Sequence, residues 1–221
     1  MSQIFISHSR ADQDGIDFIN KAFASTKVEA KYEEVEAILQ GQRNAAEISR
    51  DIIQSNALFV LLGKEIEELK HTRDWVTWES GVAAGAAFQA NKDIWVFEPL
   101  EESQRLSVVI PHLRHHVCFE MSDPWLAYIR SIVSSYDDSH VLPTALAGAG
   151  IGAGLGSAPG AVVGGIAALI LAANKQSRPT GLSVQCPKCR SNYNIHRDPA
   201  RNVMRCPVCN ARLQIQFPAL R

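Results

Sequence analysis

The sequence predicts an α/β fold in which a doubly wound parallel sheet carries helices on both faces. Short apolar runs of strand length alternate with amphipathic helical patterns. Two of the runs, residues 57–62 and 94–97, are continuously apolar, as expected for strands that are buried on both faces. The chain has 221 residues, which is enough for one medium-sized domain and smaller additions.

The first half of the chain alternates strand and helix from its start. Residues 4–6 are a short apolar strand, and residues 12–24 have the period of a helix. Ile16, Ile19 and Phe23 form its apolar face. We expect further elements as strands at 28–35 and 57–62 and a helix at 47–55.

The second half continues the alternation. We expect a helix at 75–89, strands at 94–97 and 115–120, and a last helix at 124–136. Asp74 is a suitable N-cap for the first of these helices. Gly81 and Gly85 weaken that helix, so we expect them to mark a close approach to the sheet. Cys118 lies in an apolar run and is expected in the core.

The helix at 75–89 carries an aromatic ring and a carboxylate on one face. Trp75 and Glu79 are four positions apart, so their side chains point the same way, one turn apart. Such a pair could hold a flat cationic ring attached to a sugar. The alternative is a core Trp beside a solvated surface Glu.

Residues 3–136, about 60% of the chain, resemble a TIR (Toll/interleukin-1 receptor) domain. Ile4-Phe5-Ile6-Ser7-His8-Ser9 resembles the first conserved box of that family. Residues 48–62 resemble its second helix and third strand, and Trp75-Val76-Thr77-Trp78-Glu79 resembles the Trp-x-x-x-Glu motif of TIR domains that hydrolyse NAD. The resemblance implies a flavodoxin-like sheet and an assembly-activated NAD hydrolase of the prokaryotic defence type.

The resemblance also implies a set of site residues. Glu79 would be the catalytic carboxylate, which stabilises positive charge on the ribose as nicotinamide leaves. Trp75 would stack on the pyridinium ring, and His8, Ser9 and Arg10 would bind the hydroxyl and phosphate oxygens of NAD. Linear and cyclic products remain open. So do two other functions: a non-catalytic TIR scaffold, and another nucleotide-sugar hydrolase or base-exchange enzyme.

Residues 139–175 are expected to form a glycine-zipper helical segment. No charged residue occurs from 141 to 173, and Gly148, Gly152, Gly156, Gly160 and Gly164 recur every four positions. Pro159-Gly160 predicts a turn, so we expect a helical hairpin that self-associates or inserts shallowly into a membrane. A single membrane span and a disordered linker are the alternatives.

The tail, residues 176–221, is expected to be a small zinc-ribbon β domain after a TIR-like domain at 1–138. Cys186, Cys189, Cys206 and Cys209 have the spacing C-x2-C-x16-C-x2-C, typical of a closed, structural zinc site. Expected strands are residues 191–195 and 212–217. Paired cysteines without a secretory signal favour a reducing compartment, so we expect a cytoplasmic protein, with association with the inner face of the membrane as an option.

The charge of the chain is unevenly distributed. From Lys175 onward, nine Lys and Arg residues face one acid, so the tail carries about +8 within a chain of net charge −1. A nucleic acid or an acidic protein is the expected partner, and a solvated basic face is the alternative. The basic residues near the cysteines are Lys188, Arg190, Arg197, Arg201, Arg205 and Arg212.

Overall fold

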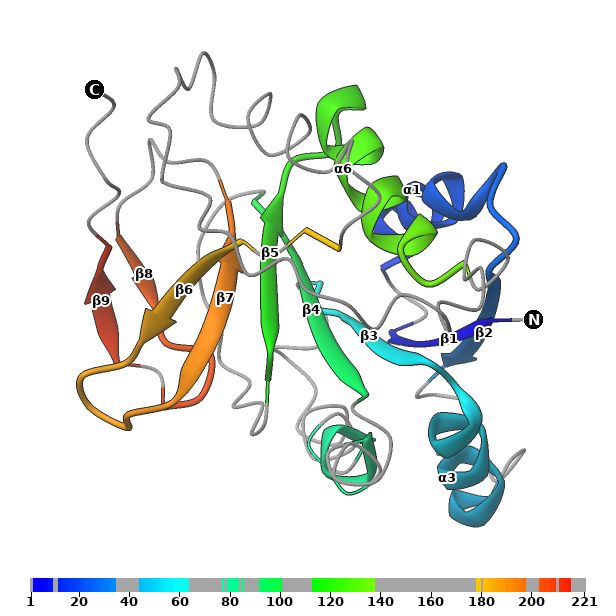
Figure 1. Cartoon of the computed structure of the whole chain (residues 1–221), viewed down its shortest axis with the longest axis horizontal. Coiled ribbons are helices and arrows are strands. Elements are labelled where there is room, and N and C mark those ends of the chain that lie inside the picture. The colour runs from blue at the N-terminus through cyan, green and yellow to red at the C-terminus, as the bar shows by residue number, and fades with distance from the viewer. Residues whose placement is uncertain are drawn as a thin grey trace, which may run out of the picture.

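The chain folds into a mixed α/β structure around a seven-stranded, mostly parallel sheet (Figure 1). This confirms the predicted α/β class with a mostly parallel sheet, whereas the predicted glycine-rich hairpin lies outside the described residues. The computed structural model describes residues 2–9, 12–34, 44–63, 77, 79–83, 85, 92–100, 113–137, 178–179, 181–197, 203–209 and 211–215.

The strand order of the sheet is β2-β1-β3-β4-β5-β7-β6. The first five strands are all parallel, and their order matches that of flavodoxin-like folds. Their bounds are β1 Gln3–His8, β2 Glu29–Glu34, β3 Ala57–Leu61, β4 Asp93–Pro99 and β5 His115–Phe119.

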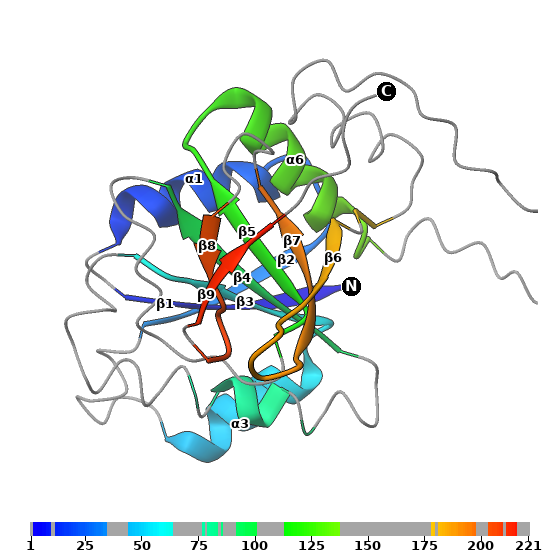
Figure 2. The same ribbon diagram turned by 90° about the vertical axis from the view of Figure 1, so that its left-hand side faces the viewer.

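Helices cover both faces of this sheet. Figure 2 shows α1 (Gln13–Phe23) and α6 (Asp123–Ser134) on one face and α3 (Ala45–Gln54) on the other. Residues 79–83 are also helical and lie on the α3 face. A capping box fixes the start of α3, because the Asn44 side chain accepts from the Glu47 amide and the Glu47 side chain accepts from the Asn44 amide. Pro124 in the first turn of α6 lacks the N–H that a helix start leaves unpaired.

Alternating side chains divide the core into two layers. On the α1/α6 face, Phe59, Trp95 and Phe97 form an aromatic layer against Ile19 and Ile129. The α3 face is more aliphatic, and its buried members on β1, β3 and β4 are Phe5, Leu58, Val60, Ile94 and Val96. A strand with apolar residues on both faces reads as an unbroken apolar run, which explains the sequence pattern at 57–62 and 94–97.

The tail continues the sheet beyond β5. β7 (Asn192–His196) pairs parallel with β5, and β6 (Leu182–Gln185) pairs antiparallel with β7. β8 (Val203–Arg205) and β9 (Arg212–Gln214) form a separate antiparallel pair that lies beside β6 and β7 (Figure 1). The cysteine-bearing tail therefore shares a core with the large sheet.

One expectation about the central helix is wrong. A Cβ at Gly81 or Gly85 would meet nothing within 4 Å, and both glycines are exposed. The helix therefore does not use them to approach the sheet, and its contact with β1 involves the buried face that carries Glu79.

Several predicted features lie outside the described residues. These are Arg10, Asp74, Trp75, Arg201 and the whole glycine-zipper segment at 139–175. In the described part of the chain, no helix has the length and apolar character needed to cross a membrane.

Candidate functional site

The predicted catalytic carboxylate lies against the end of the first strand. Ser7 is the fifth residue of β1, and its side chain points to the α3 face because it follows Phe5 by two positions. Its hydroxyl donates a hydrogen bond to Oε2 of Glu79, and both side chains are fully buried. The structure thus brings together Glu79 and the sequence box that ends β1.

The other described residues of this box lie next to that contact. His8 is buried, its Nδ1 is 3.1 Å from the backbone carbonyl oxygen of Ser9, and its ring packs edge-on against Tyr32. Ser9 is buried as well, and its carbonyl accepts a hydrogen bond of 3.1 Å from the Asp12 amide. This bond holds Asp12, the residue before α1, beside the end of β1.

This position is the point where the winding of the sheet reverses. β2 pairs with one side of β1 and β3 with the other, so the chain leaves β1 and β3 in opposite directions at their carboxyl ends. Gly63 follows β3 there, and a Cβ on it would lie 1.6 Å from the Asp12 carboxylate. Any larger residue at position 63 would force the Asp12 carboxylate to move. Open parallel sheets bind ligands at such a reversal, beyond the carboxyl ends of the strands.

The four cysteines of the tail converge on one point. Cys186 Sγ lies 3.7 Å from Cys209 Sγ, and Cys189 Sγ lies 3.8 Å from Cys206 Sγ. Tetrahedral coordination with Zn–S bonds of about 2.3 Å separates sulfur atoms by about 3.8 Å. The cluster could therefore bind a metal such as zinc.

The surroundings of the cluster act in opposite directions on its thiols, whose thiolate form binds metal: they lower the pKa of Cys189, whereas burial raises the pKa of Cys206 and Cys209. Hydrogen bonds from Ser191 lower the pKa of Cys189 to about 6. Burial has the opposite effect on Cys206 and raises its pKa to about 12, so a bound cation would have to displace that proton. A backbone hydrogen bond closes the turn that holds Cys186 and Cys189, because the Arg190 amide donates to the Cys186 carbonyl at 2.8 Å.

The basic residues of the tail do not all share one surface. Lys188, Arg190, Arg205 and Arg212 are exposed, but Arg197 is 97% buried, with a relative exposure of 3%. Arg197 therefore cannot belong to an exposed basic face. The four exposed residues all lie in or beside the two cysteine turns.

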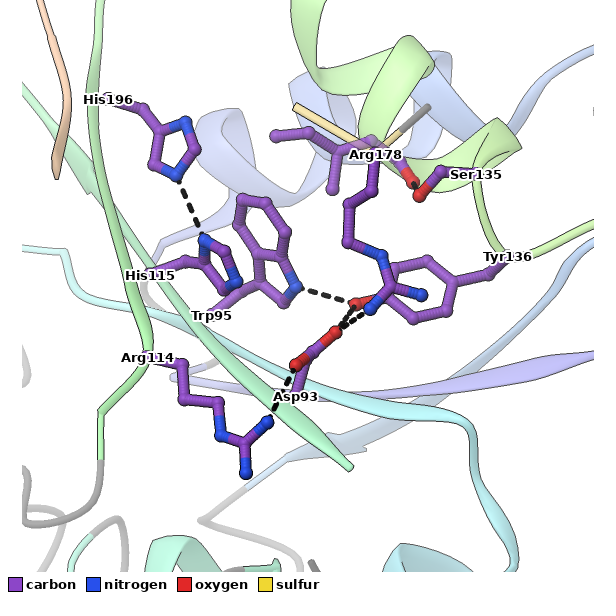
Figure 3. A network of polar contacts seen from close by, with 9 residues as sticks. Asp93, Trp95, Arg114, His115, Ser135, Tyr136, Arg178 and His196 are labelled. Atoms are coloured by element: carbon purple, nitrogen blue, oxygen red, sulfur yellow. Dashed lines mark hydrogen bonds and ion pairs between the residues drawn. The ribbon is translucent and has the colours of Figure 1, made fainter. Parts of the chain in front are cut away.

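A buried polar network fixes the tail to the sheet (Figure 3). His196 on β7 lies 3.0 Å from His115 on β5 through its Nε2 and 2.5 Å from the Tyr128 hydroxyl through its Nδ1. The His115 ring stacks on Trp95, with centroids 3.8 Å apart. Burial lowers the pKa of His115 to about 4 and keeps the pKa of His196 well below its ordinary value. Both imidazoles are therefore neutral at pH 7.

The same network continues to a buried carboxylate. The indole N–H of Trp95 donates to the Tyr136 hydroxyl at 2.7 Å, and that hydroxyl donates to Asp93 at 3.0 Å. Arg178 also pairs with Asp93, and its guanidinium lies 4.1 Å from the centre of the Tyr136 ring (Figure 3). No sequence pattern indicated this network, because its members are far apart along the chain.

The sequence analysis also did not predict a polar cluster between β4 and β5. Glu98 on β4 meets His116 and Cys118 on β5, on the α3 face of the sheet. The available signal was the spacing His-x-Cys in a strand, which places both side chains on one face. The apolar context of Cys118 led instead to a core prediction, and Cys118 is indeed buried.

Comparisons with known proteins add little to this picture. No protein-family model matches the chain, and no curated protein matches its sequence. Among solved structures, the glutaminase domain of Trypanosoma brucei CTPS with bound acivicin is similar at 14% identity and a TM-score of 0.29. That match covers 44% of this chain and 36% of the other, and a likeness this weak carries no argument.

Proposed function

We propose that this chain hydrolyses NAD at the bond between nicotinamide and ribose, as an effector of the TIR class that acts when it assembles. The observation that supports this most directly is the contact between Glu79 and Ser7. It joins two of the three stretches on which the TIR resemblance depends, and it lies where the winding of the sheet reverses.

In the proposed reaction, the bond between the ribose anomeric carbon and the pyridinium nitrogen breaks. The bonding electrons leave with nicotinamide, and positive charge develops on the ribose. Glu79 stabilises that charge from a position shielded from water. Water then adds to the anomeric carbon and loses a proton, which gives ADP-ribose. The hydrogen bond from Ser7 positions the carboxylate, so Ser7 is a positioning residue.

The remaining substrate contacts follow from the position of the first loop. His8 ends β1 and Ser9 follows it, and both would bind the ribose and phosphate oxygens together with Arg10. Trp75 precedes Glu79 by one helical turn and would stack on the pyridinium ring.

The other parts of the chain serve assembly and triggering in this proposal. Zinc in the four-cysteine cluster has a structural role, because all four ligands come from the protein. Self-association uses the TIR-like domain and the glycine-rich segment, from the cytoplasm or the inner face of a membrane. The exposed basic residues of the tail bind a nucleic acid or an acidic protein. Nucleic-acid binding should weaken steeply with salt, whereas a flat response would favour a protein partner.

Release of nicotinamide from NAD by the purified full chain tests the proposal. Glu79→Gln keeps the size of the side chain and removes its charge, so activity should fall by at least about 1000-fold if the carboxylate stabilises the transition state. Glu29→Gln is the matched control, because Glu29 is exposed and opens β2 at the opposite end of the strands from Ser7.

The assay needs a range of protein concentrations and a crowding agent, since activity depends on assembly in this proposal. A folded Glu79→Gln protein with wild-type activity would refute the catalytic role. A wild-type protein that forms assemblies and releases no nicotinamide would favour the non-catalytic scaffold. Product analysis then distinguishes ADP-ribose from a cyclic isomer.

A further inference from the structure

Three side chains with different metal-binding atoms converge on one face of β4 and β5. Glu98 and Cys118 are direct neighbours in the strand register, and His116 lies two positions before Cys118 on the same face. Their ligand atoms all lie within 4.8 Å of one another. In the described part of the chain, these side chains make polar contacts only with each other.

The distances between the ligand atoms suit a single ion. His116 Nε2 is 2.9 Å from Glu98 Oε2 and 3.5 Å from Cys118 Sγ, and Oε2 is 3.8 Å from Sγ. Zinc with ordinary bond lengths separates N, O and S ligands by about 3.3 to 3.6 Å in a tetrahedron. Each observed separation is therefore within about 0.4 Å of the value that an ion would impose.

The three side chains of this cluster are more deeply buried than is usual for polar groups that pair only with each other. His116 is 1% exposed, Cys118 is 4% exposed, and the Glu98 side chain is 14% exposed. A carboxylate and a thiol placed together away from water are costly unless charge of the opposite sign is present. His116 can supply that charge as an imidazolium 2.9 Å from Glu98, and a divalent cation would supply it in place of that proton and take the thiol as a thiolate.

We propose that Glu98, His116 and Cys118 form a second metal site, which binds zinc or a similar divalent transition metal. The combination of thiolate, imidazole and carboxylate suits zinc and is unsuited to magnesium or calcium, which prefer oxygen ligands alone. The described residues supply three ligands, the number that catalytic zinc sites take from the protein, whereas the tail cluster supplies four.

The site is separate from both of the sites described above. His116 is on the same level of the sheet as Ser7, since Ser7 pairs with Val60, Val60 with Val96, and Val96 with His116. Three strand spacings of about 4.8 Å place it about 14 Å from Ser7. The cysteine turn between β6 and β7 lies at the amino end of the parallel strands, because it directly precedes β7, which runs parallel to β5.

Zinc content of the full chain after equilibrium dialysis against micromolar free zinc tests the proposal. We expect one ion in each cluster of the wild-type chain. Cys118→Ser and Glu98→Gln should each lose one ion, and Cys209→Ser should lose the other. Glu120→Gln, an exposed glutamate just beyond β5, should lose none.

Cobalt substitution gives a second readout that does not depend on folding yields. The chain has five cysteines, so Cys118→Ser should remove roughly a fifth of the thiolate-to-cobalt absorbance and leave the tetrathiolate bands intact. Wild-type chain that binds a single ion, or a second ion that survives both Cys118→Ser and Glu98→Gln, would overturn the proposal. Neither result depends on NAD turnover, so the metal-site proposal and the proposed activity are tested independently.

Discussion

Ser7 and Glu79 are hydrogen-bonded to each other although 72 positions separate them in the sequence. Ser7 is fixed by β1, which pairs with strands on both sides, while Glu79 is carried by a helix on the α3 face. The sheet thus determines where this carboxylate points. A positioned carboxylate at the reversal of the sheet is what the proposed chemistry requires.

Ser7→Ala should separate positioning from catalysis. Loss of the hydrogen bond frees the Glu79 carboxylate to shift, and we expect kcat for nicotinamide release to fall by about 10-fold to 100-fold with little change in KM. Removing one partner of this buried bond should also cost about 1 to 3 kcal/mol of stability. Urea denaturation measures the second effect.

Ser80→Ala is the control for that experiment. Ser80 is buried beside Glu79, but its hydroxyl donates to the Thr77 carbonyl of its own helix at 2.9 Å. We expect kcat to remain within about two-fold of wild type, since no contact with the carboxylate is lost. Equal losses of kcat in both variants would show that Ser7 acts through general stability and has no specific role.

Local patterns were enough to predict most of the large sheet. The apolar runs gave β3 and β4, because strands buried on both faces need apolar side chains at every position. The capping pair Asn44 and Glu47 explains why α3 starts two residues before the apolar pattern at 47–55 indicates. These features depend on neighbours within a few positions.

The role of the tail could not be predicted in the same way. β7 pairs with β5, and nothing in the local sequence of either strand specifies that partner. Strand pairing depends on backbone groups that every residue carries, so it leaves no pattern in a single sequence. His196 illustrates this, because its two contacts, His115 and Tyr128, lie on other elements.

Metal removal should loosen the edge of the large sheet as well as the tail. Cys186 and Cys206 belong to the same buried cluster as Tyr193 and Ile195 of β7. Chelation of zinc should therefore expose β7 and lower the melting temperature by several degrees, since about 1 kcal/mol shifts a chain of this size by roughly 2 to 4 °C. Hydrogen exchange of the β5 amides should accelerate while that of β1 stays slow. Unchanged β5 protection after complete zinc removal would contradict this coupling.

Asp93→Asn should destabilise the protein more than any exposed acid. Asp93 is 5% exposed and accepts from Tyr136 and Arg178, with Arg114 at 3.5 Å. Hydrogen bonds to a buried charge contribute about 1.5 to 3 kcal/mol, so a loss of that size is expected in urea denaturation. Asp17→Asn, on the exposed side of α1, should change stability by about 0.5 kcal/mol or less. Arg178→Ala should cost about 1 kcal/mol or less, since its side chain is 39% exposed.

The neutral pair His115 and His196 should make stability depend on pH. Burial lowers both folded pKa values from the ordinary 6.5, to about 4 for His115 and well below the ordinary value for His196. The unfolded chain then binds more protons than the folded chain below pH 6.5. Stability is therefore fully present above that pH, and it falls on acidification towards pH 4 by about 1.4 kcal/mol per pH unit for each histidine.

A comparison of His115→Asn with wild type separates the histidine contribution to the pH dependence of stability from that of the carboxylates. His115→Asn keeps a polar atom near the position of Nδ1 and cannot be protonated, so the slope of unfolding free energy between pH 6 and pH 5 should drop by about 1.4 kcal/mol per pH unit. The effect follows from the position of β7, because His196 is buried only when the tail pairs with β5. A slope in His115→Asn equal to that of wild type would mean that His115 is hydrated in the folded protein and that the junction between β5 and β7 is open to water.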